Sequence, residues 1–586
     1  MLRRVRHMRR LVSPKTILLL LGLTLGTYLY SLFHNDSTIF DPSTYYTNKN
    51  VSYVFYNKLF DAIAQFKPLE PPEKNRELQD TFKCKKTGNY GLNDAKKFTH
   101  LNTFNLNHCY QLSEEQKTNL HDMHYGYVSF LKTQFNDDMI ENLLSVTSNK
   151  GSKKDGIVTV GGGRYSVLLI TMLETLRHSG TTLPVEVFIP PVDEGDDEFC
   201  SMIKEKYDAQ CVYFKDILPQ NIINEIEVKS YQIKAMALVL SHFENILFLD
   251  ADNFAMKNLN HVFESEIYKE TGLVIWPDLW RRFTAPAYYD IAEIPVNLSQ
   301  RVRYSYDDVL PVSQYTEDLN ADFTTEDTNV PFHDLKGTIA DPASESGQMM
   351  INKRKHFHTL LLALYYNIYG PKWYYNMFSQ GTAGEGDKET FISAAHALKI
   401  PYYQVRTPLG FDGFHHDVKA YQGLGLMQHD FDQDYKWHLE LLKKVHDNID
   451  EYSKFNPKYD VDNTYKREML QKTGSTKSDM VDVMFLHASF YKFDPWSLYD
   501  QDCFKTSKGE HIRGYTNQRR YGGFDFELFN FKALQDKLCN KSPAHRYRNF
   551  KYLNDKIDSE EKWDGVCRYI NDHVKYLKQT PLSSSQ

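Results

Sequence analysis

The sequence predicts an α/β protein with a mainly parallel sheet, preceded by one helix that spans a membrane. Three observations predict this. Short apolar strands alternate with helices from about residue 156, an uninterrupted apolar run occupies 16–33, and one of the strands ends directly on two aspartates separated by one residue. Strands that alternate with helices are typical of parallel sheets, because each parallel crossover needs a long connection.

Composition and charge narrow the class of protein. Of the 586 residues, 41% are hydrophobic and 25% are charged, which is typical of folded domains and excludes wholesale disorder. The net charge of -7 argues against a broad electrostatic contact with nucleic acid, so we expect no such partner. Aromatic residues make up 14% of the chain; most should fill the core, and the flat faces of the others suit sugar rings.

The amino-terminal residues predict how the chain lies relative to a membrane. Five arginines and Lys15 precede the apolar run at 16–33, whose length of eighteen residues reaches the lower limit for a membrane-spanning helix. Because positive charge lies on the amino side alone, the amino end should stay cytoplasmic and the rest should be translocated. A cleaved signal peptide is the alternative, but the run is long for one and no small-residue cleavage pattern follows it.

We therefore predict a cytoplasmic tail at 1–15, an anchor at 16–33, a stem at 34–95 and a lumenal body at 96–586. Glycosylation acceptors of the Asn-x-Ser/Thr type fit a lumenal body; they are Asn35, Asn50, Asn297 and Asn540. The seven cysteines are an odd number, so disulfide formation in an oxidising lumen would leave at least one thiol over. Their spacing does not predict the pairing.

The elements of the body are predicted in order from residue 156. Strands are expected at 157–160, 185–189, 211–214 and 245–249, and helices at 165–178, 198–207 and 231–243. This is the pattern of a Rossmann-like, doubly wound sheet, whose ligands bind at the carboxyl ends of the strands. We expect a nucleotide-binding half at about 156–280, an acceptor half at about 281–500 and a carboxyl-terminal extension at about 501–586.

The turn after the first strand is a candidate nucleotide-binding segment. Gly161-Gly162-Gly163 lacks the full dinucleotide-binding pattern and favours a nucleotide of another kind. Glycines let a backbone approach a phosphate or ribose closely, and Arg164 offers a cation for a diphosphate. A tight strand-to-helix turn without a ligand is the alternative.

The strand at 245–249 ends on Asp250-Ala251-Asp252. Alternate residues of an extended backbone point the same way, so we expect both carboxylates to converge on one cation. Oxygen ligands favour Mg²⁺ or Mn²⁺, and such an ion neutralises the diphosphate of a nucleotide sugar. His487, after a strand predicted over 483–486, is the candidate third ligand, and His429 is its rival.

Three further segments carry groups suited to an acceptor or to catalysis. One follows the presumed metal-binding strand, one precedes a strand-like stretch at about 349–352, and one is a glycine-flanked acidic motif that enters a helix. The candidates are Trp276, Asp278, Glu345, Gln348, Asp387 and Glu389. Polar groups at such positions either bond sugar hydroxyls or cap the strand and helix, and both interpretations stay open.

Together these segments resemble the fungal Golgi α-mannosyltransferases that elaborate cell-wall mannan, in particular the α-1,2-mannosyltransferases that start branches on the N-glycan outer chain. The resemblance rests on Leu249-Asp250-Ala251-Asp252-Asn253, Trp276-Pro277-Asp278, Glu345-Ser346-Gly347-Gln348 and Gly384-Glu385-Gly386-Asp387-Lys388-Glu389. It implies a GT-A-like fold, GDP-mannose as donor and Mn²⁺ as cofactor. The order of the motifs is also similar to that of retaining transferases of the glycogenin type.

The resemblance also implies a role for each group of candidate residues. Asp250, Asp252 and His487 would hold the metal, and Asp387 or Glu389 would orient the acceptor or take part in catalysis. The donor would contact Gly161, Gly162, Gly163, Arg164, Lys234 and Asp250. The acceptor would contact Trp276, Asp278, Glu345 and Gln348.

We therefore expect a type II Golgi membrane protein that transfers mannose from GDP-mannose to the α-mannan of N-linked glycans with retention of configuration. A complex with other mannosyltransferases is part of this expectation. An α-1,3-mannosyltransferase and a non-catalytic lumenal mannan-binding protein are the alternatives. A glycoside hydrolase is disfavoured, because it needs two facing carboxylates and no nucleotide-binding pattern.

Overall fold

The computed structural model describes residues 42–71, 100–147, 154–225, 229–305, 307–316, 322–323, 325, 330–382, 384–418, 421–452, 481–540 and 546–581. The predicted cytoplasmic tail, the predicted anchor at 16–33 and Asn35 lie outside these residues. Across the described ranges, no helix combines the length and the apolar composition that crossing a bilayer requires. The other glycosylation acceptors, Asn50, Asn297 and Asn540, are exposed.

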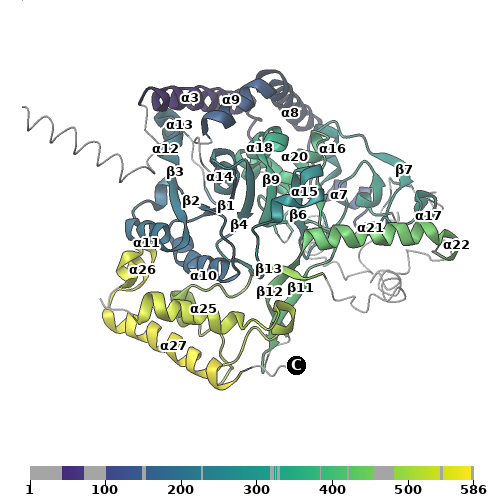
Figure 1. Ribbon diagram of the computed structural model, residues 1–586. Helices are drawn as coiled ribbons and strands as arrows, with labels where there is room; N and C mark the ends of the chain where they lie inside the picture. Colours follow the sequence, from purple (N-terminus) through teal and green to yellow (C-terminus); the bar gives the residue numbers. More distant parts are fainter. Residues whose placement is uncertain are drawn as a thin grey trace, which may run out of the picture.

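The main sheet has seven strands among the described residues, in the order β10-β6-β9-β4-β1-β2-β3 (Figure 1). The strands are β1 (Asp155–Val160), β2 (Val185–Ile189), β3 (Ala209–Tyr213), β4 (Asn245–Leu249), β6 (Leu273–Pro277), β9 (Ser344–Asn352) and β10 (Tyr403–Gln404). Strand β1 pairs in parallel with β2 and β4, as do β2 with β3 and β6 with β10. Strand β9 alone in this sheet runs antiparallel to its neighbours β4 and β6. The prediction of an α/β fold with a mainly parallel sheet is confirmed.

Helices cover both faces of this sheet because the side chains of each strand alternate between two cores. In β4, Ile246 and Phe248 pack into one core with α14 (Gln232–Leu240), α18 (Lys353–Ile368) and α20 (Thr390–Ala397). Leu247 and Leu249 pack into the other core with α10 (Arg164–His178) and α11 (Asp197–Tyr207). The strands and helices predicted between 157 and 249 are all present, with ends that differ by a few residues.

A second sheet of four antiparallel strands stands beside the first, in the order β11-β12-β13-β5 within the described residues. Its strands are β5 (Asn253–Ala255), β11 (Gly410–His415), β12 (Tyr421–His429) and β13 (Val483–Ala488). Strands β7 (Asn297–Arg301) and β8 (Leu335–Lys336) form a separate pair. The aspartates of the Asp-Ala-Asp segment lie in the turn between β4 and β5, so this turn connects the two sheets.

Part of the predicted stem belongs to the body. Residues 42–65 form α3 (Pro42–Gln65), which lies beside α8 (Glu114–Gln134) and α9 (Asp137–Thr147) (Figure 1). Phe55, Tyr56 and Leu59 of α3 are buried, and the Phe55 ring lies 4.8 Å from that of Phe135. A chain that buries these side chains is not a free spacer, so the folded body begins earlier than the predicted boundary at residue 96.

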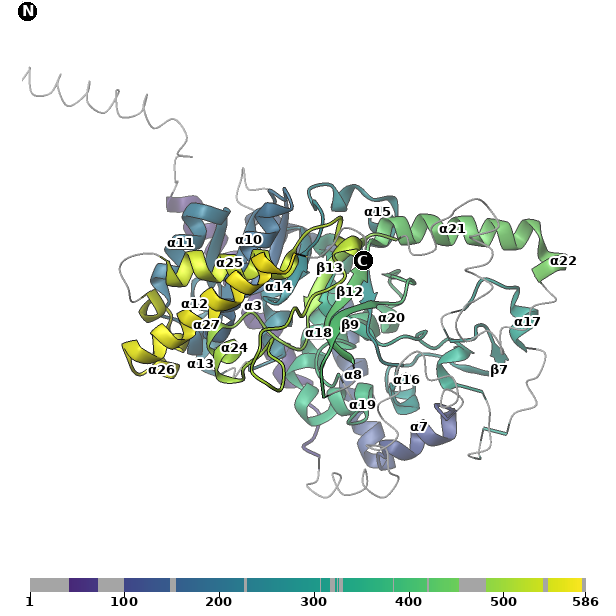
Figure 2. The same ribbon diagram turned by 90° about the horizontal axis from the view of Figure 1, so that it is seen from below.

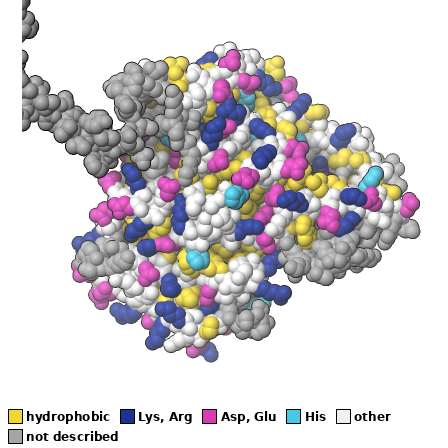
Figure 3. Space-filling view, in the orientation of Figure 1, with side chains coloured by type: hydrophobic (Ala, Val, Ile, Leu, Met, Phe, Trp, Pro, Cys, Tyr) yellow, Lys and Arg dark blue, Asp and Glu magenta, His cyan; other side chains and the backbone are white. Residues whose placement is uncertain are grey.

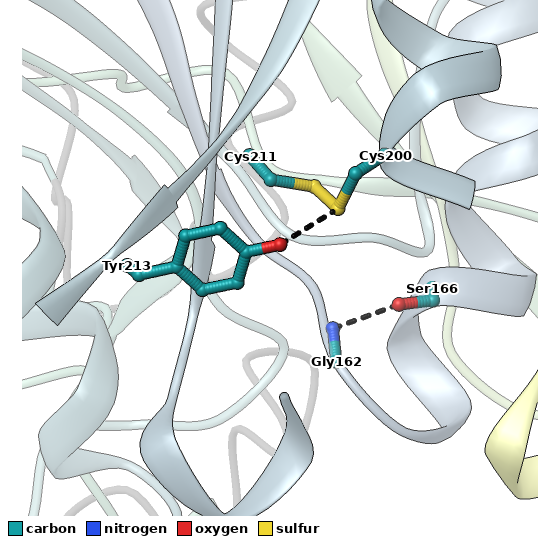
Figure 4. Close-up of a disulfide and its surroundings, with 5 residues drawn as sticks. All are labelled: Gly162, Ser166, Cys200, Cys211 and Tyr213. Carbon is teal, nitrogen blue, oxygen red and sulfur yellow. Dashed lines mark hydrogen bonds between the residues drawn. A yellow bond between two sulfur atoms is a disulfide. The ribbon is translucent and has the colours of Figure 1, made fainter. Parts of the chain in front are cut away.

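The carboxyl-terminal helices α25 (Phe526–Leu534) and α27 (Glu560–Gln579) pack against each other, and α25 also packs on α10 (Figure 2). A disulfide between Cys539 and Cys567 joins the π-helical turn η7 (Gln535–Cys539) to α27. A second disulfide joins Cys200 of α11 to Cys211 of β3, where the Tyr213 hydroxyl lies 3.5 Å from the Cys200 sulfur (Figure 4). Among the described cysteines, Cys503 is a buried free thiol.

Apart from α21, which has 17 residues, the remaining helices are short. They are α7 (Thr103–Cys109), η1 (Pro191–Asp193), α12 (Phe214–Ile217), α13 (Gln220–Glu225), η2 (Val262–Glu264), α15 (Glu266–Thr271), α16 (Pro286–Ile291), α17 (Val312–Thr316), η3 (Phe332–Asp334), η4 (Gly370–Tyr374), α19 (Tyr375–Ser379), α21 (Phe431–Asp447), α22 (Ile449–Tyr452), α24 (Pro495–Asp500), η6 (Gln518–Tyr521), η8 (Arg546–Asn549) and α26 (Lys551–Lys556). Basic and acidic side chains are interspersed on the face drawn in Figure 3, so no stripe of one sign crosses it.

Candidate active site

A cleft of about 610 Å³ opens where the parallel strands end. Val160 ends β1, and Asp193, Asp250 and Asp278 follow β2, β4 and β6. Because β9 is antiparallel, its amino end, with Glu345, meets the same edge of the sheet. The cleft therefore lies where open α/β sheets bind their ligands. Eight predicted site residues line it: Arg164, Lys234, Asp250, Asp252, Asp278, Glu345, Asp387 and His487.

Backbone hydrogen bonds from two different strands hold the Asp-Ala-Asp segment. The Asp250 amide donates to the Gly347 carbonyl of β9 at 2.8 Å, and the Ala488 amide of β13 donates to the Asp252 carbonyl at 3.0 Å. The Asn253 amide closes the segment by donating to the Asp250 carbonyl at 3.0 Å. Both carboxylates line the cleft, but the expected extended backbone is wrong: a turn between β4 and β5 brings them there.

Lys234 organises one side of the cleft. Its ammonium donates to Asp250 Oδ2 at 3.1 Å, pairs with Asp387 Oδ2 at 3.2 Å and donates to the Ser346 carbonyl at 2.8 Å. Burial would lower the pKa of Lys234, but Asp250 and Asp387 outweigh it and raise the pKa. Burial raises the pKa of Asp250 to about 6 in spite of Lys234. The lysine predicted to contact the donor thus holds two candidate carboxylates in place.

On the other side of the cleft, His487 lies between the carboxylates of Asp252 and Glu345. Its Nε2 is 3.4 Å from Asp252 Oδ1, and its Nδ1 is 3.7 Å from Glu345 Oε2. Burial opposes the charged imidazole, but these carboxylates raise the pKa of His487 to about 10. Burial likewise opposes ionisation of Asp252, but Lys492, which donates to Asp252, and His487 lower its pKa. Asp252, His487 and Glu345 therefore form one charged row.

The acidic motif at 384–388 also lines the cleft. Lys388 donates to Asp278, a buried carboxylate whose pKa is raised by burial. Asp387 faces Lys234 and accepts a hydrogen bond from the Ser346 hydroxyl at 3.3 Å. The structure thus brings Asp278, Asp387 and Lys388 to the same cavity as the Asp-Ala-Asp segment.

The three glycines after β1 do not line the cleft. The Gly161 amide donates to the Phe188 carbonyl, and the Gly162 amide donates to the Ser166 hydroxyl at 2.9 Å (Figure 4). A Cβ at Gly162, where φ is +91°, would lie 2.5 Å from Asp193 Cβ. Because these glycines have no side chain, the loop that carries Asp193 packs closely against them. This agrees with the alternative interpretation of a tight strand-to-helix turn. Contact of the glycines with a donor stays a prediction.

Four other candidates are also buried away from the cleft. Trp276 is fully buried and donates from its indole to the His429 carbonyl at 2.7 Å, and His429 itself is buried beside Arg520. Gln348 accepts from Asn253, and Glu389 pairs with the buried Arg282. Because these side chains already hold neighbouring elements together, the structure gives them no surface toward a ligand.

The chain matches known proteins over most of its length. The family described as "Mannosyltransferase putative" matches residues 154–430. The alpha-1,2-mannosyltransferase MNN5 of Saccharomyces cerevisiae is 45% identical, with 91% of each chain covered. The alpha-1,2-mannosyltransferase MNN2 of the same yeast is 42% identical over 90% of this chain and 85% of that protein.

The chain belongs to this mannosyltransferase family. It is therefore a glycosyltransferase, and the prediction of the family is confirmed. Among solved structures, the glycosyltransferase GlyE of Streptococcus pneumoniae TIGR4 is 12% identical with a TM-score of 0.28, over 66% of this chain and 64% of that chain. A score this low establishes no common fold.

Several side chains of the enzyme's cleft carry no recognisable sequence signal. Tyr165 and Tyr231 line it, but no motif marks them; Lys492, which follows His487 in the sequence, also lines it. Asp193 also lines it, and the rule that ligands bind at strand ends points to the residues after β2, which would have suggested it. Lys388 lies inside the acidic motif. Its ion pair with Asp278 could not be predicted, because the two residues are far apart in the sequence.

The carboxylate oxygens and the imidazole nitrogens that line the enzyme's cleft are atom types that bind divalent cations. Among the described residues, no three His, Cys, Asp or Glu side chains are already arranged to hold a metal ion. However, seven carboxylates line the cleft against five lysine and arginine side chains and the charged imidazole of His487, so negative charge is in slight excess there. A divalent cation bound among these carboxylates would reduce their repulsion toward a diphosphate. A metal ligand must be a neutral imidazole, so His487 would lose a proton on binding an ion.

Proposed function

We propose that the enzyme transfers mannose from GDP-mannose to the α-mannan of N-linked glycans, in cell-wall mannoprotein glycosylation, and forms an α-1,2 linkage with retention of configuration. The linkage takes its support from the relatives, which are named as α-1,2-mannosyltransferases. One observation carries the proposal: Asp250, Asp252, Asp387 and His487 come from separate segments and line one cleft at the ends of a mainly parallel sheet.

We propose a GT-A-like arrangement for the catalytic body. Its support is the position of the Asp-Ala-Asp turn, which leaves a parallel nucleotide-binding sheet at β4 and enters the antiparallel sheet at β5. Residues from both sheets thus meet at this turn, so a donor held by the first sheet would face groups supplied by the second.

Asp250, Asp252 and His487 would hold the divalent ion, proposed to be Mn²⁺. When bound, such an ion supplies positive charge against the diphosphate of the leaving GDP. Lys234 keeps Asp250 and Asp387 in fixed positions before substrate binds, which lowers the cost of reorganisation during the reaction. Asp387 faces the cavity, so its carboxylate would accept a hydrogen bond from an acceptor hydroxyl; Glu389, paired with Arg282, would not.

The location of the enzyme is also a proposal. The apolar run at 16–33 and the arginines before it favour a single-pass type II protein of the Golgi membrane with a lumenal body. Protease protection of sealed Golgi vesicles tests this: the body should resist proteolysis until detergent opens the membrane. Co-purification would test a complex with other mannosyltransferases.

The reaction is tested with the detergent-solubilised full chain, GDP-mannose, Mn²⁺ and a mannose oligosaccharide. A product with a new α-1,2-linked mannose is the expected result, as read by linkage analysis. A new α-1,3 linkage would replace the proposed linkage. Oligosaccharide binding without transfer, or sugar release without nucleotide, would reject the transferase reaction itself.

A further inference from the structure

Three exposed aromatic side chains lie on or directly after neighbouring strands of the antiparallel sheet. Phe411 of β11, Tyr421 of β12 and Phe490, which follows β13, expose 37%, 45% and 58% of their surfaces. We call these three residues the aromatic shelf. Most other aromatic residues of the chain fill two large cores, so a group of exposed rings is a candidate contact surface.

The shelf is built around a glycine. A Cβ placed on Gly423 would lie 3.2 Å from the Phe411 ring and 3.9 Å from the Tyr421 ring, so both rings flank the same point of β12. The Phe490 amide donates to the carbonyl of the next residue, Leu424, at 3.2 Å. The Phe411 and Tyr421 rings therefore flank Gly423, where the missing side chain leaves the backbone open between them, and the backbone of Phe490 is bonded to the next residue of β12.

Phe490 of the shelf lies close to the active-site cleft along the chain. Phe490 stands between His487 and Lys492, both of which line the cleft. Because an extended chain spans at most about 3.6 Å per residue, the Phe490 Cα lies within about 7 Å of that of Lys492 and about 11 Å of that of His487. Strand β12 is also tied to the candidate metal-binding turn, since Gly425 pairs with Ala488, whose amide donates to the Asp252 carbonyl.

We propose that the aromatic shelf binds the acceptor mannan chain outside the cleft, so that sugar rings lie against Phe411, Tyr421 and Phe490 while the chain's end enters the cleft. This inference rests on the proposed transfer of mannose to mannan. Aromatic faces suit the apolar faces of sugar rings. The shelf residues carry no charge, which matches a neutral polysaccharide rather than an anionic lipid or nucleic acid.

The proposal is tested by comparing acceptors of different length on the full-length enzyme. We expect Phe490→Ala and Tyr421→Ala, singly and with Phe411→Ala, to raise KM for a long mannose oligosaccharide, by about tenfold or more in the triple variant. KM for a mannose disaccharide, which reaches only the cleft, and kcat for the long acceptor should stay near wild-type values. Tyr125→Ala is the matched control, because this tyrosine is 55% exposed on α8, far from β11 and β12 in Figure 1.

Other outcomes would overturn the proposal. Unchanged KM for the long acceptor in folded Phe490→Ala and Tyr421→Ala proteins would do so, as would an equal loss for both acceptor lengths. A change in oligomeric state with unchanged KM would assign the shelf to a second copy of the chain. If the wild-type enzyme transfers no mannose to either acceptor, the proposed function fails, and that result is distinct from a failure of the shelf alone.

Discussion

A single buried lysine sets the positions of the carboxylates on one side of the cleft. Lys234 contacts Asp250, Asp387 and Ser346 at once, so its charge offsets two carboxylates that would otherwise repel each other. Single buried side chains of this kind determine the geometry of the candidate site. Lys234 and two other buried side chains can be tested directly by substitution.

Lys234→Met should destabilise the folded enzyme. Removing one member of a buried ionic group leaves the others uncompensated, which typically costs about 3–5 kcal/mol. The free energy of unfolding in urea measures this, and Lys234→Met combined with Asp387→Asn should recover part of the loss. A Lys234→Met protein as stable as wild type would contradict the role given to this lysine.

Trp276→Phe should weaken the fold without affecting the acceptor. The change removes the indole donor and leaves the buried His429 carbonyl unpaired, at a cost of about 1–3 kcal/mol. Unfolding in urea and acceptor KM are measured together. A raised acceptor KM at unchanged stability would restore the sequence-based prediction that Trp276 contacts the acceptor.

Lys353 predicts a pH dependence of stability. Its ammonium donates to the Val239 and Ser241 carbonyls, and burial lowers its pKa from 10.5 to about 7. Between these pH values the unfolded chain binds more protons, so this group makes stability rise with pH from about 7 toward 10. The difference in unfolding free energy between wild type and Lys353→Met should therefore change across this window, and a constant difference would contradict the shift.

The sequence predicts the residues of the cleft unevenly, for a physical reason. Asp250 and Asp278 follow strands, and the ends of parallel strands share one edge, so their position is predictable from local patterns. Trp276 and Glu389 lie in equally suggestive motifs, yet tertiary packing buries both against partners far away in sequence. Spacing cannot distinguish a polar group that faces a ligand from one that holds two elements together.

At the scale of elements, local periodicity predicts strands and helices but not how distant ones pair. The elements between 157 and 249 follow from apolar runs and turns. The antiparallel direction of β9 could not be predicted from such local patterns, because it depends on the path of the long segment after β6. That direction is what brings Glu345 to the cleft.

Helix α3 gives the test at this scale. Phe55→Ala should cost about 3–5 kcal/mol of unfolding free energy, because its ring packs against Phe135 and Phe357. Val54→Ala, at a neighbouring position that is 64% exposed, is the control and should change little. If both changes left stability unaffected, α3 would not contribute to the folded body.

At the scale of the whole molecule, the cleft depends on two sheets that meet at one turn. The mainly parallel sheet supplies Asp250, and the antiparallel sheet supplies His487, on β13. The division into a nucleotide-binding half and an acceptor half stays a prediction. The second sheet could not be predicted, since its strands are contributed by segments as distant as β5 and β13.

The central claim is that the carboxylates of the Asp-Ala-Asp turn hold a divalent ion that allows a nucleotide diphosphate to bind. The most direct measurement is calorimetric titration of GDP into the full-length enzyme, with Mn²⁺ and with EDTA, for wild type and Asp252→Asn. We predict that wild type binds GDP with Mn²⁺ and not with EDTA, and that folded Asp252→Asn loses the Mn²⁺-dependent binding and mannose transfer. Equal GDP binding by both proteins in both conditions, with transfer at the wild-type rate, would contradict the claim.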